Sequence, residues 1–149
     1  MTIAPLAAPT EAAAPLARWS ARLELGFRAD DRGTRLAHRA HHGPLVVQKP
    51  LYPEGDSVCH VIVVHPPGGI AGGDELRIDL EVGAGASALV TTPGAAKWYR
   101  SAGPVARQSV ALRVEGCLEW LPQEAIVFDG ARASSSLEVD LGEIGRAHV

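Results

Sequence analysis

The chain has 149 residues and a formal net charge of −3 at pH 7, and 46% of its residues are hydrophobic. This composition can supply one domain with an apolar core, and it excludes a chain that is disordered throughout. Because nucleic-acid surfaces need clustered Lys and Arg, a pI of about 6.0 argues against DNA or RNA as a partner. The sequence also has no apolar run long enough to span a bilayer, so we expect no membrane partner.

The two ends of the chain differ in character from its middle. Residues 1–18 are rich in Ala and Pro and lack the basic and apolar regions of a signal peptide, which predicts a disordered tail. Glu143–Val149 read EIGRAHV, which is the translation, in one frame, of a widely used DNA sequencing adapter. We therefore expect residues 143–149 to be a non-native tail, with a natural terminal tail as the alternative, and residues 19–142 to hold the domain.

Short strands separated by turn signals fill the region between these ends. Glu75–Val82 alternate charged and apolar residues, which predicts a half-buried strand, and Ser57–Val64 are almost continuously apolar, which predicts a strand buried on both faces. Only Gly94–Tyr99 could form a turn of helix, so the predicted fold class is all-β. Further strands are expected at Arg22–Phe27, Thr34–His41, Leu45–Gln48, Ala86–Thr92, Ser109–Val114, Cys117–Leu121, Ala125–Phe128 and Leu137–Leu141.

The stretch His65–Asp74, HPPGGIAGGD, lies between two of these strands. Its glycine pairs lack the GK[ST] of a phosphate loop and do not open a helix, so neither phosphate nor dinucleotide binding is indicated. A structural interpretation is simpler, with glycines at positive φ or where a neighbouring strand comes close. Asp74 is expected to bond the backbone of its own turn. The glycines are Gly68, Gly69, Gly72 and Gly73, and Pro93-Gly94 mark a second turn.

No catalytic or closed metal site is visible in the sequence. There is no GxSxG elbow, and no serine is paired with a histidine and an acid. On an extended strand Cys59 and His65 would lie about 20 Å apart, which is too far to share one ion. Cys59 and Cys117 are expected to be buried and reduced, with a single disulfide as the alternative.

Several motifs together resemble a known family. HPPGGIAGGD, then TTPGAAKWYRS (Thr91–Ser101) and LEWLPQEAIVFDGARA (Leu118–Ala133), are similar in order and spacing to the urease accessory protein UreD, called UreH in some systems. GPLVVQKPLYPEG (Gly43–Gly55) fits the same family. The similarity runs from about Trp19 to about Leu141, and family members continue well beyond that point.

The resemblance implies a non-catalytic scaffold that binds apo-urease and, with UreF and the GTPase UreG, supports nickel insertion into urease in the cytoplasm. It also implies an elongated β structure with helix-like stacking of strands, and a path for nickel through the interior. No tightly bound cofactor is expected, and imidazole and carboxylate groups suit Ni²⁺ as transient ligands. The candidate transient ligands are His65, Asp74, Glu124 and Asp129, although Glu124 and Asp129 could equally face water.

Lys97, Tyr99 and Arg100 are candidates for partner contact, because Tyr and Arg are common interface anchors. The alternative is that Trp98 and Tyr99 are core aromatics and that the cations are solvated. A different interpretation of the whole chain is a ligand-binding β module. That interpretation requires exposed aromatic residues on one sheet face, whereas aromatics make up only 5% of the chain.

Overall fold

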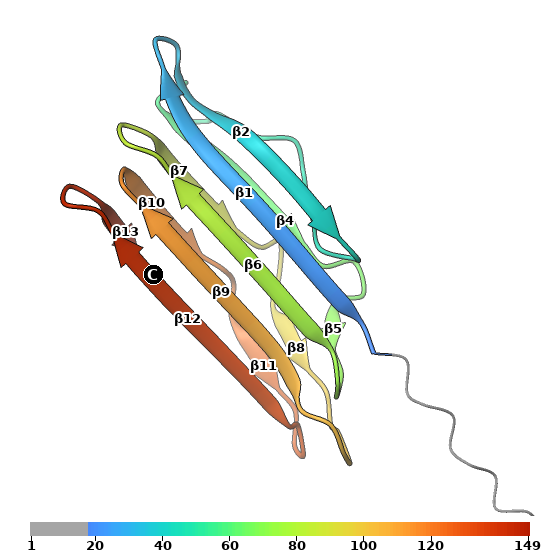
Figure 1. The fold of residues 1–149 in the computed structure, drawn as a ribbon. Coiled ribbons are helices and arrows are strands. Elements are labelled where there is room, and N and C mark those ends of the chain that lie inside the picture. The colour runs from blue at the N-terminus through green and yellow to red at the C-terminus, as the bar shows by residue number, and fades with distance from the viewer. Residues whose placement is uncertain (1–17) are drawn as a thin grey trace, which may run out of the picture.

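The computed structural model describes residues 18–149 as thirteen β-strands, with no helix in that range (Figure 1). The all-β prediction is confirmed, while the predicted disordered tail falls almost wholly on residues 1–17, outside the described residues. Since the described part of the chain holds no helix, none there could cross a membrane. The strands are β1 (Ser20–Asp30), β2 (Gly33–His42), β3 (Val46–Val47), β4 (Val58–Val64), β5 (Gly69–Ile70), β6 (Glu75–Val82), β7 (Ser87–Thr91), β8 (Ala96–Trp98), β9 (Ala106–Val114), β10 (Cys117–Leu121), β11 (Ala125–Val127), β12 (Ala133–Leu141) and β13 (Arg146–His148).

The strands form three sheets around one interior. Two sheets have five strands each, in the orders β12-β9-β6-β1-β2 and β13-β10-β7-β4-β3, and the third has the order β11-β8-β5. From β4 onward the chain visits the three sheets in turn, and each strand lies parallel to the strand one coil earlier. The result is a solenoid, in which the long strands of the first sheet lie side by side at the front of Figure 1. The expected helix-like stacking of strands is confirmed.

One coil of the solenoid takes about 29 residues. In the second sheet the paired positions are 58, 87, 117 and 146, which are 29, 30 and 29 residues apart. Because the pairing is in register, residues one coil apart form rows that run along the solenoid. Alternate residues of each strand point into the interior, so apolar rows build the core.

The row through Leu25, Leu80, Leu112 and Val139 shows this core. The three leucines are 1–2% exposed, whereas Val139 on the last strand of its sheet is 38% exposed. Since β12 has a sheet neighbour on one side only, its inward side chains lack the cover that the other three residues receive.

The opposite end of the front sheet is closed by a hairpin. β1 lies parallel to β6 and antiparallel to β2, and the turn between β1 and β2 uses Gly33 at a φ of 121°. A register shift opposite Gly26 and Phe27 leaves Ala37 of β2 without a direct partner.

Three local predictions are wrong. Gly94–Tyr99 contains no helical turn, because Ala96–Trp98 pair with β5 on one side and β11 on the other. Cys117 is exposed, although Cys59 is buried as expected, and both thiols are free. β4 is not buried on both faces, since its residues alternate between buried and half-buried.

Two terminal observations complete the fold. Arg146–His148, within the segment expected to be non-native, form β13 and pair with β10. At the other end, the N–H of Glu75 donates to the carbonyl of Trp19 at 2.8 Å, which ties the start of β1 to β6.

Candidate functional site

Backbone geometry and close contacts explain the glycines of His65–Asp74. Gly68 and Gly73 have φ values of +71° and +94°, a region that residues with a Cβ rarely adopt. A Cβ on Gly69 would overlap the ring of Tyr99, and a Cβ on Gly72 would overlap the side chain of Ser101. Positive φ and close approach, the two causes expected from the sequence, are therefore both present. Gly94 lies in open space with no positive φ, so nothing in its surroundings requires glycine.

Asp74 holds this loop together and is 4% exposed. Its Oδ2 accepts the N–H of Ala71 at 2.8 Å, as expected for a residue that bonds its own turn. Its Oδ1 accepts the N–H of Trp19 at 3.1 Å, which fixes the entry of β1 against the loop. Both carboxylate oxygens are thus engaged with backbone donors, which indicates a structural role.

His65 lines a cavity of about 400 Å³ whose wall includes buried residues such as Ile70 and exposed residues such as Gln123. Most of the wall is apolar, and Gln108 adds an amide from β9. Burial lowers the pKa of His65 below its ordinary value, and the negative charge of Asp74 partly opposes that shift. The imidazole is therefore neutral at pH 7, the form that can accept a proton or ligate a metal through nitrogen.

Tyr99 and Phe128 form an aromatic pair on the outside of the third sheet. Tyr99 is 44% exposed and Phe128 is 45% exposed, and their rings stack with centroids 5.4 Å apart. Beside them, Arg100 Nη2 lies 3.4 Å from Oδ2 of Asp129. Trp98 is buried in the core. Of the two aromatic residues that the sequence left open as core or partner-binding, Trp98 therefore belongs to the core and Tyr99 to the surface.

Sequence reasoning missed Phe128 and Ile126, which complete this surface. Lys97 pairs with Ile126 across the sheet, and both are exposed. The signal that could have found them is the coil period, since positions 97, 99 and 100 stand 29 residues before positions 126, 128 and 129. We call the resulting surface the Tyr99 patch, and its members are Lys97, Tyr99, Arg100, Ile126, Phe128 and Asp129.

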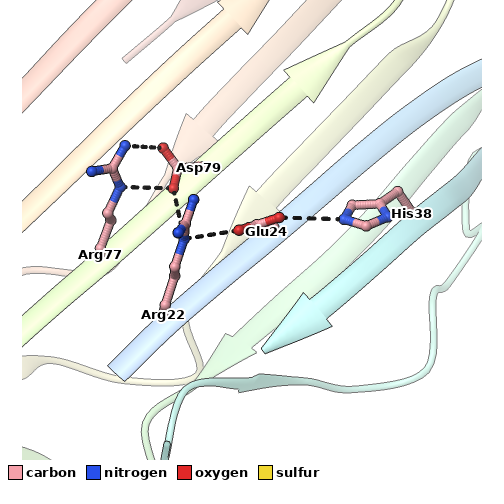
Figure 2. A network of polar contacts seen from close by, with 5 residues as sticks. All are labelled: Arg22, Glu24, His38, Arg77 and Asp79. Atoms are coloured by element: carbon pink, nitrogen blue, oxygen red, sulfur yellow. Dashed lines mark hydrogen bonds and ion pairs between the residues drawn. The ribbon is translucent and has the colours of Figure 1, made fainter. Parts of the chain in front are cut away.

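A second polar surface covers the outer face of the front sheet, and Figure 2 shows its ion-pair network. Arg77 donates to Asp79 at 2.9 and 3.1 Å, and Arg22 reaches Glu24 at 2.8 Å and Asp79 at 3.4 Å. Glu24 also lies 3.5 Å from His38 on β2. The hydrogen bonds from Arg77 hold the pKa of Asp79 below its usual range. Because most of these side chains are exposed, the network shapes the surface more than it stabilises the fold.

The comparison with known proteins fits these features. Residues 20–149 match the sequence profile of the UreD urease accessory protein. This chain belongs to the UreD urease accessory protein family. The family resemblance found in the motifs is confirmed.

Relatives of this UreD-family chain are similar over most of its length. It is 60% identical over 131 residues to urease accessory protein UreD from Azoarcus sp. (strain BH72), covering 85% of this chain and 45% of that protein. It is 59% identical over 130 residues to UreD from Dechloromonas aromatica (strain RCB), covering 86% and 45%. For UreD from Delftia acidovorans the identity is 55% over 133 residues, covering 87% and 43%. The chain thus spans less than half the length of these relatives.

The four candidate transient ligands do not form one site in this UreD-family chain. Among residues 18–149, no group of three or more His, Cys, Asp or Glu side chains could hold a metal ion together. Glu124 is exposed and the side chain of Asp129 is 99% exposed, so each faces water, one of the two alternatives left open by the sequence. Only His65 and Asp74 belong to the same loop.

Proposed function

We propose that the protein is a non-catalytic scaffold in urease maturation, which binds apo-urease and, with UreF and UreG, supports nickel insertion into the urease active site. The observation that carries the proposal is the family match over residues 20–149. The work would take place in the cytoplasm, with no nucleic acid or membrane as partner and no tightly bound cofactor.

The Tyr99 patch supports a scaffold role. A stacked Tyr–Phe pair beside an arginine combines residue types that often anchor interfaces, and its two residues directly follow the paired strands β8 and β11. Because the two rings already stack on each other in the free chain, they have less freedom to lose on binding, which favours affinity. We assign Lys97, Tyr99 and Arg100 to partner contact on this basis.

Transient nickel handling is supported by how the candidate ligands are placed. A neutral imidazole in a largely apolar cavity can bind Ni²⁺ through nitrogen, and no group of three or more His, Cys, Asp or Glu side chains within residues 18–149 could enclose the ion. A single nitrogen ligand binds weakly and releases quickly, as a delivery protein requires. His65 is therefore our first candidate contact for nickel, ahead of Asp74, whose oxygens already accept backbone hydrogen bonds.

One observation favours a second candidate function, a ligand-binding β module. The cavity of about 400 Å³ falls within the range typical of small-molecule sites. Retention of a small apolar ligand by the purified protein, without any urease partner, would favour this alternative. The family match makes the scaffold the stronger proposal.

A pulldown tests the scaffold role. The tagged chain is mixed with apo-urease, UreF and UreG, and we expect at least one of them to be retained. Tyr99→Ala should weaken retention about tenfold, since buried aromatic anchors dominate interfaces. Leu51→Ala is the matched control, because Leu51 is a 49% exposed apolar residue outside the patch. Retention of none of the three proteins would overturn the proposal.

Calorimetry with Ni²⁺ tests the metal role separately. We expect weak, exchangeable binding that His65→Gln reduces further. A stoichiometric nanomolar site with cysteine ligation would contradict transient nickel handling. It would not affect the scaffold role, which the pulldown tests separately.

A further inference from the structure

One edge of the front sheet is open. β2 pairs with β1 on one side and is the last strand of its sheet, at the edge opposite β12 in Figure 1. On its other side, the N–H of Thr34 donates to the carbonyl of Asp56 at 2.8 Å, near the start of the strand. Within the described chain, residues 37–42 make no backbone hydrogen bond to any segment other than β1. Residues 37–42 are exposed without interruption, so this half of the edge is a free template for another strand.

The open edge carries basic side chains and no acidic ones, although the chain as a whole has a formal net charge of −3. Residues 32–53 contain no Asp or Glu. The register places Arg39 and His41 opposite Leu25 and Leu23, on the interior side of the strand, and His38 on the outer side opposite Gly26. Among the described residues, Arg39, His41 and His42 have no acidic partner, whereas His38 lies near Glu24.

These basic side chains make the edge selective. A second copy of β2 would offer Arg39 no carboxylate to pair with, because residues 37–42 contain no Asp or Glu. An acidic strand would instead pair with Arg39 and with the histidines on both faces. Basic edge residues also limit aggregation through exposed strands. The same side chains therefore disfavour pairing with basic strands and favour pairing with acidic ones.

We infer that residues 37–42 of β2 form a docking site for an extended acidic segment of a partner protein, which adds to the front sheet as a further strand. The backbone of the segment bonds the free edge, and its carboxylates meet Arg39 and His41 on one face and His38 and His42 on the other. This surface lies on the front sheet, apart from the Tyr99 patch on the third sheet. It goes beyond the proposed role in nickel insertion, and its partner is defined by chemistry alone.

Three peptide probes test the inference on the unchanged protein. The first is a fluorescein-labelled peptide of about eight residues that repeats Glu-Glu-Thr-Thr, so that carboxylates fall on both faces of the added strand, and it is long enough to pair with the exposed half of β2. The second replaces Glu by Lys, and the third keeps Glu but carries methyl groups on alternate backbone nitrogens. Fluorescence polarisation at low salt should show binding of the first probe only. Hydrogen exchange should slow at residues 37–42 when that probe binds.

Charge reversal tests the residues. The double substitution Arg39→Glu with His41→Glu should weaken binding about tenfold, because it removes the Arg39 charge and places two carboxylates against those of the peptide. Arg107→Glu is the matched control on the same sheet, three strands away, and should leave binding unchanged. If the double variant fails to fold, the methylated probe still decides the question.

Several results would overturn the inference. Equal binding of the methylated probe would mean ion pairing without strand addition. Equal binding of the Lys probe would remove the charge argument, and equal competition by oligo-dT would indicate a general polyanion site. Protection outside residues 37–42 would place the peptide elsewhere, and concentration-dependent dimerisation through β2 without peptide would make a second copy the occupant.

Discussion

The strands β1 and β12 carry the same inward apolar pattern and yet differ sharply in burial. On β1, Leu23, Leu25 and Phe27 are 0%, 2% and 0% exposed. Their counterparts in the same rows on β12 are 46%, 38% and 50% exposed. The counterparts are Leu137, Val139 and Leu141.

Hydrophobicity alone therefore does not decide burial among the described strands, since both strands present apolar side chains to the interior. What differs is the number of neighbours. β1 lies between β2 and β6, whereas β12 pairs with β9 alone. Each coil is stabilised mainly by the coils next to it, as in other repeat proteins, so the same substitution should cost less on β12 than on β1 or β9.

The largest expected effect sharpens this comparison with two leucines on adjacent strands. Leu112 is 1% exposed and Leu137 is 46% exposed. Leu112→Ala should lower the free energy of unfolding by about 2–5 kcal/mol, because it leaves a cavity in the core. Leu137→Ala should cost less than half as much, since much of that side chain is already in water. Denaturant unfolding measures both, and equal losses would show that the neighbouring coil does not control burial.

The same comparison of a crowded and an open position can be made for two glycines in loops, Gly72 and Gly94. Gly72→Val should destabilise the fold by about 1–3 kcal/mol, because the new side chain must displace Ser101 and the carbonyl of Pro104. Gly94→Val is the control, since a side chain there meets open space. Gly72→Val should lower the solubility of the protein and alter its circular dichroism spectrum. Binding to any one partner should be reduced less than folding is. A well-folded Gly72→Val protein that has lost one partner only would contradict the structural role of this glycine.

Asp74 and Asp129 compare a buried carboxylate with an exposed one. Asp74→Ala leaves the N–H groups of Ala71 and Trp19 without their acceptor, which should cost about 1–3 kcal/mol. Asp129→Ala, at a side chain that is 99% exposed, should change stability little. Thermal unfolding of the two variants provides the measurement. If Asp74→Ala unfolds at the wild-type temperature, the carboxylate does not hold the loop.

The strand pattern was predictable because burial on one face leaves a period of two in the sequence. Glu75–Val82 are the clearest case, with Leu76, Ile78, Leu80 and Val82 all buried. β8 was not predictable in this way, because it has three residues and its pairing partners are distant in sequence. Cys117 was misjudged for the related reason that residue type alone does not reveal which side of a strand faces the interior.

The candidate surfaces were only partly predictable. The motif around Tyr99 pointed to a partner site, but its stacking with Phe128 depends on the coil period of about 29 residues, which emerges from strand pairing. The open edge of β2 left a trace in the sequence, a basic, histidine-rich segment without acids. Whether such a strand lies at the edge of a sheet is decided by topology, which local sequence does not encode.

The smallest expected effect is a dependence of stability on pH that arises from His65. Burial lowers the pKa of His65 below its ordinary value of 6.5, so below pH 6.5 the unfolded chain takes up a proton more readily than the folded one. Stability is then complete above the unfolded pKa and falls as pH decreases toward the folded pKa, where both states become protonated. His65→Gln should flatten this dependence and leave stability at pH 8 nearly unchanged. Denaturant unfolding between pH 5 and 8, with NMR titration of the His65 ring, measures both quantities. A measured pKa of 6.5 or above for the His65 ring would mean that the imidazole is solvated. That result would contradict the partly buried position of His65 in the wall of the cavity.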